Sequence, residues 1–183
     1  MDDFEYMFQN KKFTIISITV ILIAIGAAIY FSQISSKRDD IISFSEDDAE
    51  MNLAIKTAKS TLNHFENALL SNDSNFGYFG LKIRYETFDD IEYIWVKDVY
   101  FKDNEFYGYV DSKPYGIDKI KLGDLVEINK NNISDWLYYD SAQGVFYGGY
   151  TIVVIKNRLS KKEQKEGGFD KMLFAPDNPQ IVY

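Results

Sequence analysis

The sequence predicts an α+β protein in which one long amphipathic helix packs on a curved, mainly antiparallel sheet of about five or six strands, preceded by an N-terminal transmembrane helix. Three observations lead to this fold class. Residues 13–31 form an uncharged apolar run, a helical period of apolar residues follows, and aromatic and β-branched runs separated by short turns begin at Tyr78.

The uncharged run, FTIISITVILIAIGAAIYF, has about the length that a helix needs to cross a bilayer. Residues 1–12 form a short tail that opens acidic, and the run is longer than the apolar part of a cleaved signal peptide. We therefore expect a stable anchor rather than a signal peptide or a buried helix. Lys11 and Lys12 directly precede it and favour a cytoplasmic N-terminus. The predicted location is the bacterial inner membrane, single-pass, with the C-terminal domain outside the cytoplasm.

The chain after the anchor divides into a linker, 32–45, a domain, 46–166, and a C-terminal tail, 167–183. The linker mixes Ser, Asp, Lys and Arg without an apolar period. Ser45 is expected to cap the long helix that follows. The apolar positions of this helix fall in one stripe, which should face the sheet: Met51, Ile55, Ala58, Leu62, Phe65 and Leu69.

The β-rich part of the sequence contains six predicted strands, at residues 78–87, 91–101, 105–111, 117–129, 136–139 and 149–156. The turns between them are too short for crossover helices, so the strands should pair antiparallel. The second and sixth strands are apolar on both faces and should be central. Ser160 and Glu163 form a capping box that predicts a short final helix, ended by Gly167.

Composition excludes several classes of function. The chain has no cysteine, which excludes disulfides, thiolate metal sites and cysteine nucleophiles. From Asp39 onward, 16 Lys and Arg face 25 Asp and Glu, a net charge of −9. An acidic domain of this kind disfavours nucleic acid and suits a basic protein partner or none.

Motifs spread over the domain resemble one family. They are Asp48, Met51, Asn52, Ala54, Ile55, Ala58, Thr61, Leu62 and Phe65 in the helix, then Trp95-Val96 and Asp98, Ile120-Lys121-Leu122-Gly123-Asp124, Ile133-Ser134-Asp135-Trp136 and Gly149-Tyr150-Thr151. Together they resemble the bacterial YegJ-like family, domain of unknown function 2314. The resemblance covers about 46–166 and implies no activity, because the family has none established.

Several candidate ligand groups have a simpler structural explanation. His64, the single histidine, lies on the predicted solvent face of the helix. The acidic groups at 47–50 and 89–92 lack the spacing of a calcium loop and fit a helix start and a turn. We therefore predict no metal, no cofactor and no catalytic residue.

The segment Ile133-Ser134-Asp135-Trp136 is the strongest candidate site, because it resembles a turn that presents an indole to a ligand. The predicted binding residues are Asp135, Trp136, Tyr138 and Tyr150. The structural alternative is a turn in which Ser134 and Asp135 bond to their own backbone while Trp136 anchors the core.

The tyrosines of the strands offer a second candidate surface. Those predicted to form an exposed patch that meets another protein are Tyr100, Tyr107, Tyr109, Tyr138, Tyr139 and Tyr147. The sequence thus favours a membrane-anchored, non-catalytic binding or accessory module. Two alternatives are a hydrolase-like enzyme with a carboxylate-based site near Asp135 and Asp111, and an acidic inhibitor of a basic protein.

Overall fold

The computed structural model describes residues 47–87, 90–117 and 119–176. The predicted N-terminal tail at 1–12, the predicted membrane span at 13–31 and the predicted linker at 32–45 lie outside the described residues. Across the three described ranges, no helix is both long enough and apolar enough to span a bilayer.

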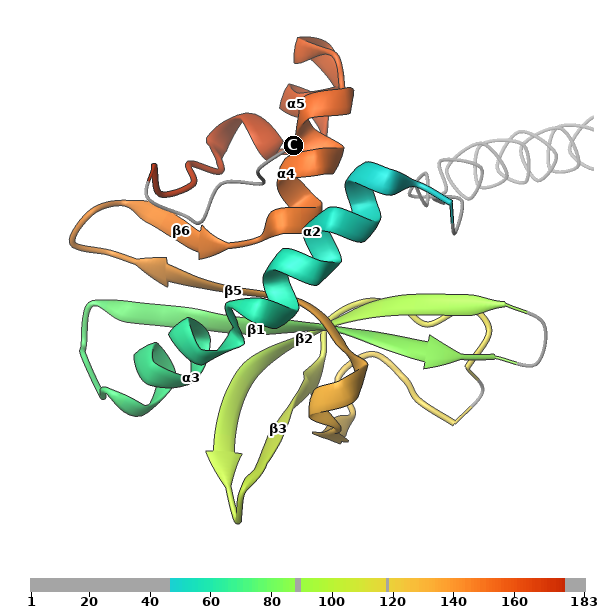
Figure 1. Ribbon diagram of the computed structural model, residues 1–183, viewed down its shortest axis with the longest axis vertical. Helices are drawn as coiled ribbons and strands as arrows, with labels where there is room; N and C mark the ends of the chain where they lie inside the picture. The colour runs from blue at the N-terminus through green and yellow to red at the C-terminus, as the bar shows by residue number, and fades with distance from the viewer. Residues whose placement is uncertain (1–46, 88–89, 118, 177–183) are drawn as a thin grey trace, which may run out of the picture. The chain divides into compact units, whose positions relative to one another are not determined.

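Six antiparallel strands form one sheet in the order β4-β3-β2-β1-β5-β6 (Figure 1), which confirms the predicted α+β class and strand number. The strands are β1 Phe76–Glu86, β2 Ile91–Lys102, β3 Glu105–Val110, β4 Leu125–Ile128, β5 Ile133–Asp140 and β6 Val145–Gly148. The pairing of β1 with β5 contains two register shifts and that of β2 with β3 contains one. Tyr78 lies at the first shift of β1 and Asp98 at the shift of β2, both with positive φ, as expected where a bulge bends a strand.

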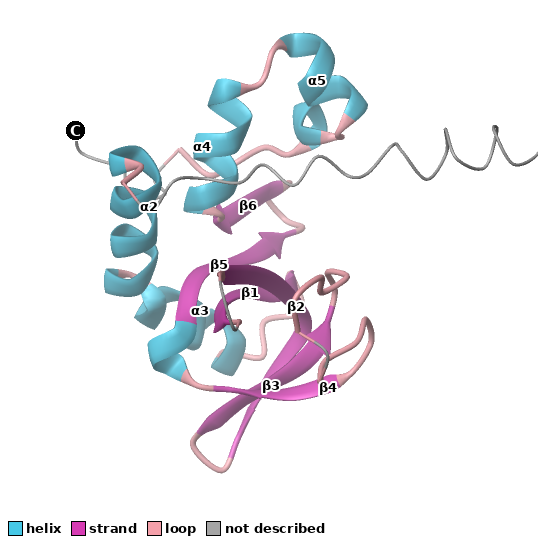
Figure 2. Cartoon of the chain, turned by 90° about the vertical axis from the view of Figure 1, so that its right-hand side faces the viewer, coloured by secondary structure: helices cyan, strands magenta, loops and turns pink. Residues whose placement is uncertain are grey.

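Two helices, α2 Ala49–Ser60 and α3 Leu62–Leu70, pack on the same side of the sheet (Figure 2). The prediction of one long helix is wrong, because α2 ends and α3 begins on either side of Thr61. The Thr61 hydroxyl donates to the Thr57 carbonyl at 2.8 Å. The expected Ser45 cap is also wrong. The cap of α2 is Asp48, whose carboxylate accepts from the Met51 N–H at 3.1 Å.

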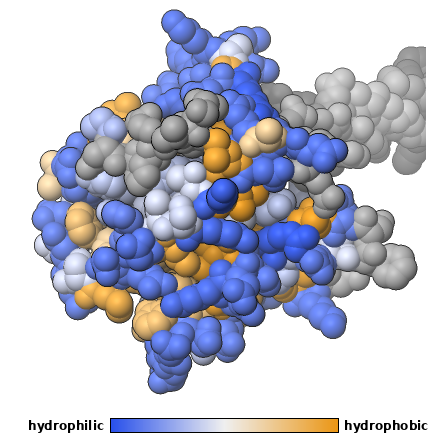
Figure 3. Space-filling model, in the orientation of Figure 1, coloured by the Kyte–Doolittle hydropathy of each residue, from blue (hydrophilic) through white to orange (hydrophobic). Residues whose placement is uncertain are grey.

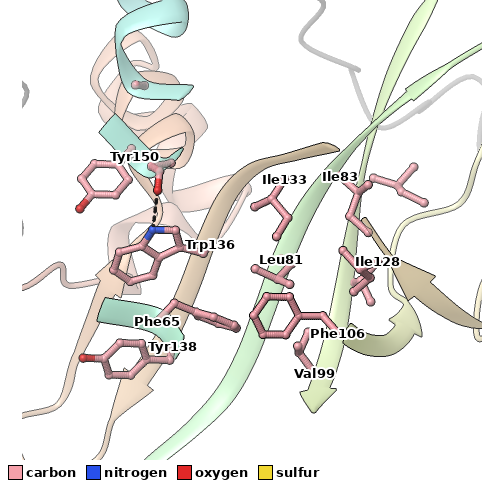
Figure 4. Packing of buried hydrophobic residues seen from close by; sticks show 14 of the residues in the cluster. Phe65, Leu81, Ile83, Val99, Phe106, Ile128, Ile133, Trp136, Tyr138 and Tyr150 are labelled. Carbon is pink, nitrogen blue, oxygen red and sulfur yellow. Dashed lines mark hydrogen bonds between the residues drawn. The ribbon is translucent and has the colours of Figure 1, made fainter. Parts of the chain in front are cut away.

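The apolar stripe faces the sheet as predicted. Met51, Ala58 and Phe65 are buried, and the other three stripe residues pack against the core. Phe65 lies at the centre (Figure 4), where its ring meets Phe106 and Trp136 with centroids 6.0 Å apart in each case. The register of β1 and β2 places Leu81 and Val96 opposite each other in this core. We call the sheet side that contacts α2 and α3 the inner face, and the opposite side the outer face.

The predicted sixth strand, Gly149 to Lys156, is wrong: residues Tyr150–Arg158 form helix α4. Gly148 and Gly149 both have positive φ and redirect the chain out of β6, a strand that the sequence did not predict. The β-branched residues of this segment favour a strand locally, but burial of Tyr150, Thr151 and Val154 on one side of a helix overrides that preference.

Other boundaries also differ from expectation. Among the described residues of the predicted fourth strand, only Leu125–Ile128 form a strand, which the 3-10 helix η1, Lys130–Asn132, follows. The final helix, α5 Lys161–Glu166, has the predicted capping box, and η2, Phe169–Lys171, follows it. The chain then pairs with β6, since the Phe146 N–H donates to Leu173 O and the Ala175 N–H donates to Phe146 O.

Candidate functional site

Asp135 lies inside β5 and not in a turn, so the predicted turn at Ile133–Trp136 is wrong. Its carboxylate is fully buried. One oxygen accepts from the backbone N–H groups of Trp136 at 2.8 Å and Tyr150 at 3.2 Å. The other accepts from the Thr151 N–H at 2.8 Å and the Thr151 hydroxyl at 2.6 Å. Four donors therefore converge on one carboxylate.

This carboxylate closes the N-terminus of α4. The residue at the cap position, Gly149, has no side chain to accept from the first N–H groups of the helix. Asp135, in strand β5, accepts hydrogen bonds from these N–H groups instead. It also places a negative charge at the positive end of the helix dipole. The β5–α4 junction is thus held by hydrogen bonds that join Asp135 to Tyr150 and Thr151, 15 and 16 positions later in the chain.

Lys82 completes the polar cluster on the outer face. It pairs with Asp135 across β1 and β5, its Nζ donates to Thr151 Oγ1 at 3.2 Å, and it lies 5.5 Å from the centre of the Tyr93 ring. Burial lowers the pKa of Lys82, while the Asp135 charge opposes that change. Burial raises the pKa of Asp135, while the Thr151 hydroxyl and the Lys82 charge oppose it.

The other predicted binding residues lie in the core beside Asp135. The Trp136 indole N–H donates to the Ala58 carbonyl at 3.0 Å (dashed line in Figure 4), and its ring stacks on Tyr138. The Tyr150 hydroxyl lies 3.2 Å from Thr61 Oγ1. The structure brings the four predicted residues together, and none of them exposes more than 7% of its surface. Their side chains hold β5 to α2 and α4.

Asp111, the second carboxylate of the hydrolase alternative, forms an ion pair with Lys97, with 2.7 Å between Oδ1 and Nζ. General acid–base work requires a carboxyl group that reaches a substrate. Asp135 has no exposed surface, and both of its oxygens accept hydrogen bonds. This geometry disfavours Asp135 as an acid or base.

The predicted acidic groups have structural roles. Asp48 and Glu50 both bind Arg158 at the end of α4, and Arg158 Nη2 lies 2.8 Å from Asp48 Oδ1. Glu92 accepts from the backbone N–H groups of Tyr115 and Gly116. His64 is exposed, as predicted. Within 47–87, 90–117 and 119–176, no group of three or more His, Asp or Glu side chains could hold a metal ion.

The outer face carries the exposed tyrosine side chains of strands β1, β2 and β3. Tyr93 and Lys97 alternate with the inward-facing Ile94 and Val96 of β2, and Tyr109 lies opposite Lys97. We call five residues the tyrosine surface: Tyr78, Tyr93, Tyr100, Tyr107 and Tyr109. Four of them are exposed by 39–56%, and Tyr107 is half-buried.

This surface only partly matches the patch predicted from the sequence. Tyr100 and Tyr109 are exposed as predicted, Tyr107, Tyr139 and Tyr147 are half-buried, and Tyr138 is in the core. Tyr78 and Tyr93 were missed. The signal for Tyr93 was present, because a residue between two buried neighbours of a strand points to the opposite face. The face of the molecule that Figure 3 shows is mostly hydrophilic, with hydrophobic residues in separate areas.

The fold and the buried junction define an α+β domain with a six-stranded antiparallel sheet and a helix capped from a neighbouring strand. The sequence profile of the uncharacterized proteins conserved in bacteria, domain of unknown function 2314, matches residues 48–173. The chain belongs to this family, as the motifs predicted.

Two curated proteins are similar to the chain. The chain is 28% identical over 136 residues to the uncharacterized protein YegJ of Escherichia coli, a match that covers 74% of this chain and 84% of that protein. It is 29% identical over 75 residues to a putative ankyrin repeat protein of Neisseria meningitidis serogroup B. That match covers 41% of this chain and 29% of the Neisseria protein. No solved structure matches the chain significantly.

Proposed function

We propose that this protein is a membrane-anchored, non-catalytic binding or accessory module that contacts a protein partner through the tyrosine surface. The exposure of Tyr78, Tyr93, Tyr100 and Tyr109 on one side of the sheet is the observation that supports it. Tyrosine is enriched in protein interfaces, because its ring contributes apolar area and its hydroxyl remains satisfied by water or a partner.

Burial of Asp135 favours binding over hydrolysis. A carboxylate that accepts four hydrogen bonds in the interior stabilises the fold and offers no atom to a substrate. The contact surface that we propose is therefore the tyrosine surface rather than the interior cluster of Asp135, Trp136, Tyr138 and Tyr150.

The proposed partner surface is tested by photo-crosslinking in cells that naturally make the protein. A photoreactive phenylalanine derivative replaces Tyr109, and the same derivative replaces Tyr115 as a control, because Tyr115 is exposed by 57% but lies in a loop outside the surface. We expect one recurrent protein adduct from position 109 and none from position 115. Equal labelling from both positions would contradict the proposed surface.

The proposed anchor at 13–31 supports a location in the bacterial inner membrane with the domain outside the cytoplasm. The apolar length of the segment and the lysines before it are the support for this orientation. Protease added to spheroplasts should remove the domain without lysis. Protection of the domain until the inner membrane is broken would reverse the proposed orientation.

An acidic inhibitor of a basic protein is the second candidate function. The net charge of −9 from Asp39 onward favours it, because electrostatic attraction speeds the association of oppositely charged proteins. Association of this kind should weaken steeply with salt. A crosslinked partner with an acidic surface would exclude this candidate and leave the binding module in place.

A further inference from the structure

The β2–β3 hairpin carries a stacked pair of tyrosine rings on the outer face of the sheet. Tyr100 and Tyr107 face each other across the two strands, with ring centroids 5.5 Å apart and ring planes 19° apart. Tyr109 follows on the same face of β3 and is exposed by 41%. Each ring of the stacked pair has a second face, turned away from its neighbour, on which a planar group can stack.

Carboxylates surround this aromatic surface. The Tyr107 hydroxyl donates to Glu127 at 3.3 Å. Tyr107 pairs with Glu127 of β4, Glu105 lies two residues before Tyr107 on the same face of β3, and Asp103 lies in the turn between β2 and β3. Partial burial, followed by the charges of these carboxylates, raises the pKa of Tyr107. In the described chain, two cations are neighbours of this surface, and each lies beside a carboxylate: Lys102 is 3.8 Å from Asp103, and Lys97, opposite Tyr109, pairs with Asp111. The local charge is therefore negative in the part of the chain that the structure describes.

This combination selects a partner chemistry. A guanidinium group stacks on a tyrosine face through its plane and donates hydrogen bonds to carboxylates through its edge. An acidic segment would be repelled by the surrounding carboxylates, and a purely apolar segment would desolvate them without pairing them. Lysine would satisfy the carboxylates but would stack less well, because its ammonium group is compact and strongly hydrated.

We propose that Tyr100, Tyr107 and Tyr109, with Asp103 and Glu127 beside them, bind an arginine-containing, positively charged segment of a partner protein. This inference rests on the proposed binding function and names the chemistry of the partner. The arginines stack on the tyrosine rings, and the carboxylates fix the edges of their guanidinium groups.

The test uses the full chain in phosphatidylcholine nanodiscs, which carry no net charge that could attract the probe. The probe is a fluorescein-labelled peptide of alternating Arg and Gly, and its binding is followed by fluorescence anisotropy. Peptides of alternating Lys and Gly and of alternating Glu and Gly are the comparison probes. We expect the Arg peptide to bind most tightly, the Lys peptide more weakly and the Glu peptide not at all.

Matched variants separate the surface from the overall charge. The double variant Tyr100→Ala and Tyr107→Ala should raise the Kd of the Arg peptide by about tenfold or more, whereas Tyr115→Ala should leave it unchanged. Glu127→Gln should weaken binding more than Glu166→Gln, an equal change of charge on the exposed face of α5. Melting curves check the fold, and Glu127→Lys, at an exposed position, provides a second variant if the tyrosine pair proves necessary for folding.

Three results would overturn the inference: no binding of the Arg peptide, equal binding of the Arg and Lys peptides, or equal effects of the surface and control variants. A recurrent crosslinked partner from position 109 together with any of these results would leave the proposed binding function standing and remove only the arginine chemistry. Tight binding of the Arg peptide without a crosslinked partner would leave the arginine chemistry standing and remove the proposed partner contact at position 109.

Discussion

Asp135 shows how one buried side chain determines the path of the backbone. Its carboxylate accepts from three backbone N–H groups and one hydroxyl, that of Thr151, and the Lys82 ammonium donates to the same hydroxyl. A buried polar group of this kind contributes little while it is satisfied and costs much when a partner is lost. The residue therefore belongs to the stability of the β5–α4 junction.

Replacement of this carboxylate by an amide should destabilise the protein. Asp135→Asn turns one acceptor oxygen into a donor that faces other donors, at a cost of about 1–3 kcal/mol for each buried group left unsatisfied. The measurement is the melting temperature of the full chain, with the exposed Asp98→Asn as the control. An unchanged melting temperature for Asp135→Asn would show that the junction does not depend on the carboxylate.

At the scale of elements, α4 is held at both ends by residues from elsewhere in the chain. Asp135 accepts from its first N–H groups, and Arg158 in its last turn binds Asp48 and Glu50 at the start of α2. The Arg158 guanidinium holds the pKa of the Asp48 carboxyl well below its ordinary value of 3.8. The two helices are thus joined by an ion pair that depends on pH.

The pH dependence follows from the sign of this shift. A carboxyl whose pKa is lower in the folded than in the unfolded state stabilises the fold above the unfolded pKa, and this stabilisation is lost as the pH falls below it. We therefore expect the melting temperature to fall more between pH 7 and pH 3 in the wild type than in Asp48→Asn. Parallel curves for the two proteins would contradict a role for this ion pair.

The turn into α4 requires glycine at position 148 for two reasons: a positive φ and a lack of space for a Cβ atom. Gly168, which follows α5, has a positive φ but free space, so it isolates the first reason. Gly148 has φ +75°, and a Cβ there would lie 2.1 Å from the Trp136 carbonyl oxygen. Gly168 has φ +76° with nothing within 4 Å of its Cβ position. Gly168→Ala should cost only the backbone strain, about 1–2 kcal/mol, whereas Gly148→Ala should cost clearly more. Chemical denaturation of both variants measures the difference, and equal losses would show that the contact with Trp136 relaxes freely.

At the scale of the whole molecule, the domain has a core of its own. Phe65, Phe106 and Trp136 meet at its centre, the buried strand residues of this core come from β1 to β5, and Tyr147 of β6 packs against it. A core of this kind is sufficient for a domain to fold alone. The predicted anchor should therefore be dispensable for folding.

Deletion of residues 1–31 tests this independence. The shortened chain should melt cooperatively near the temperature of the full chain and enter the aqueous phase in detergent partitioning, while the full chain enters the detergent phase. An unfolded shortened chain would show that the core is incomplete without the N-terminal segment. Full-length protein in the aqueous phase would contradict the predicted anchor.

The sequence determined the features that depend on local periodicity. The stripe from Met51 to Leu69 identified the helical layer, the apolar residues on both faces of β2 identified a central strand, and the Ser160 and Glu163 pair identified the start of α5. The motifs from Asp48 to Thr151 identified the family. Each of these signals lies within a few residues of the structure that it predicts or is repeated along the chain.

Only the tertiary structure decided the conformation and role of the candidate site. Residues 150–156 carry a strand pattern, but Asp135 and the glycine pair make them a helix, and Trp136 is oriented by the Ala58 carbonyl 78 positions away. Local preference amounts to a fraction of a kcal/mol per residue, whereas burial of a large side chain and satisfaction of buried polar groups amount to several. Contacts between distant residues therefore decided what the local pattern left open.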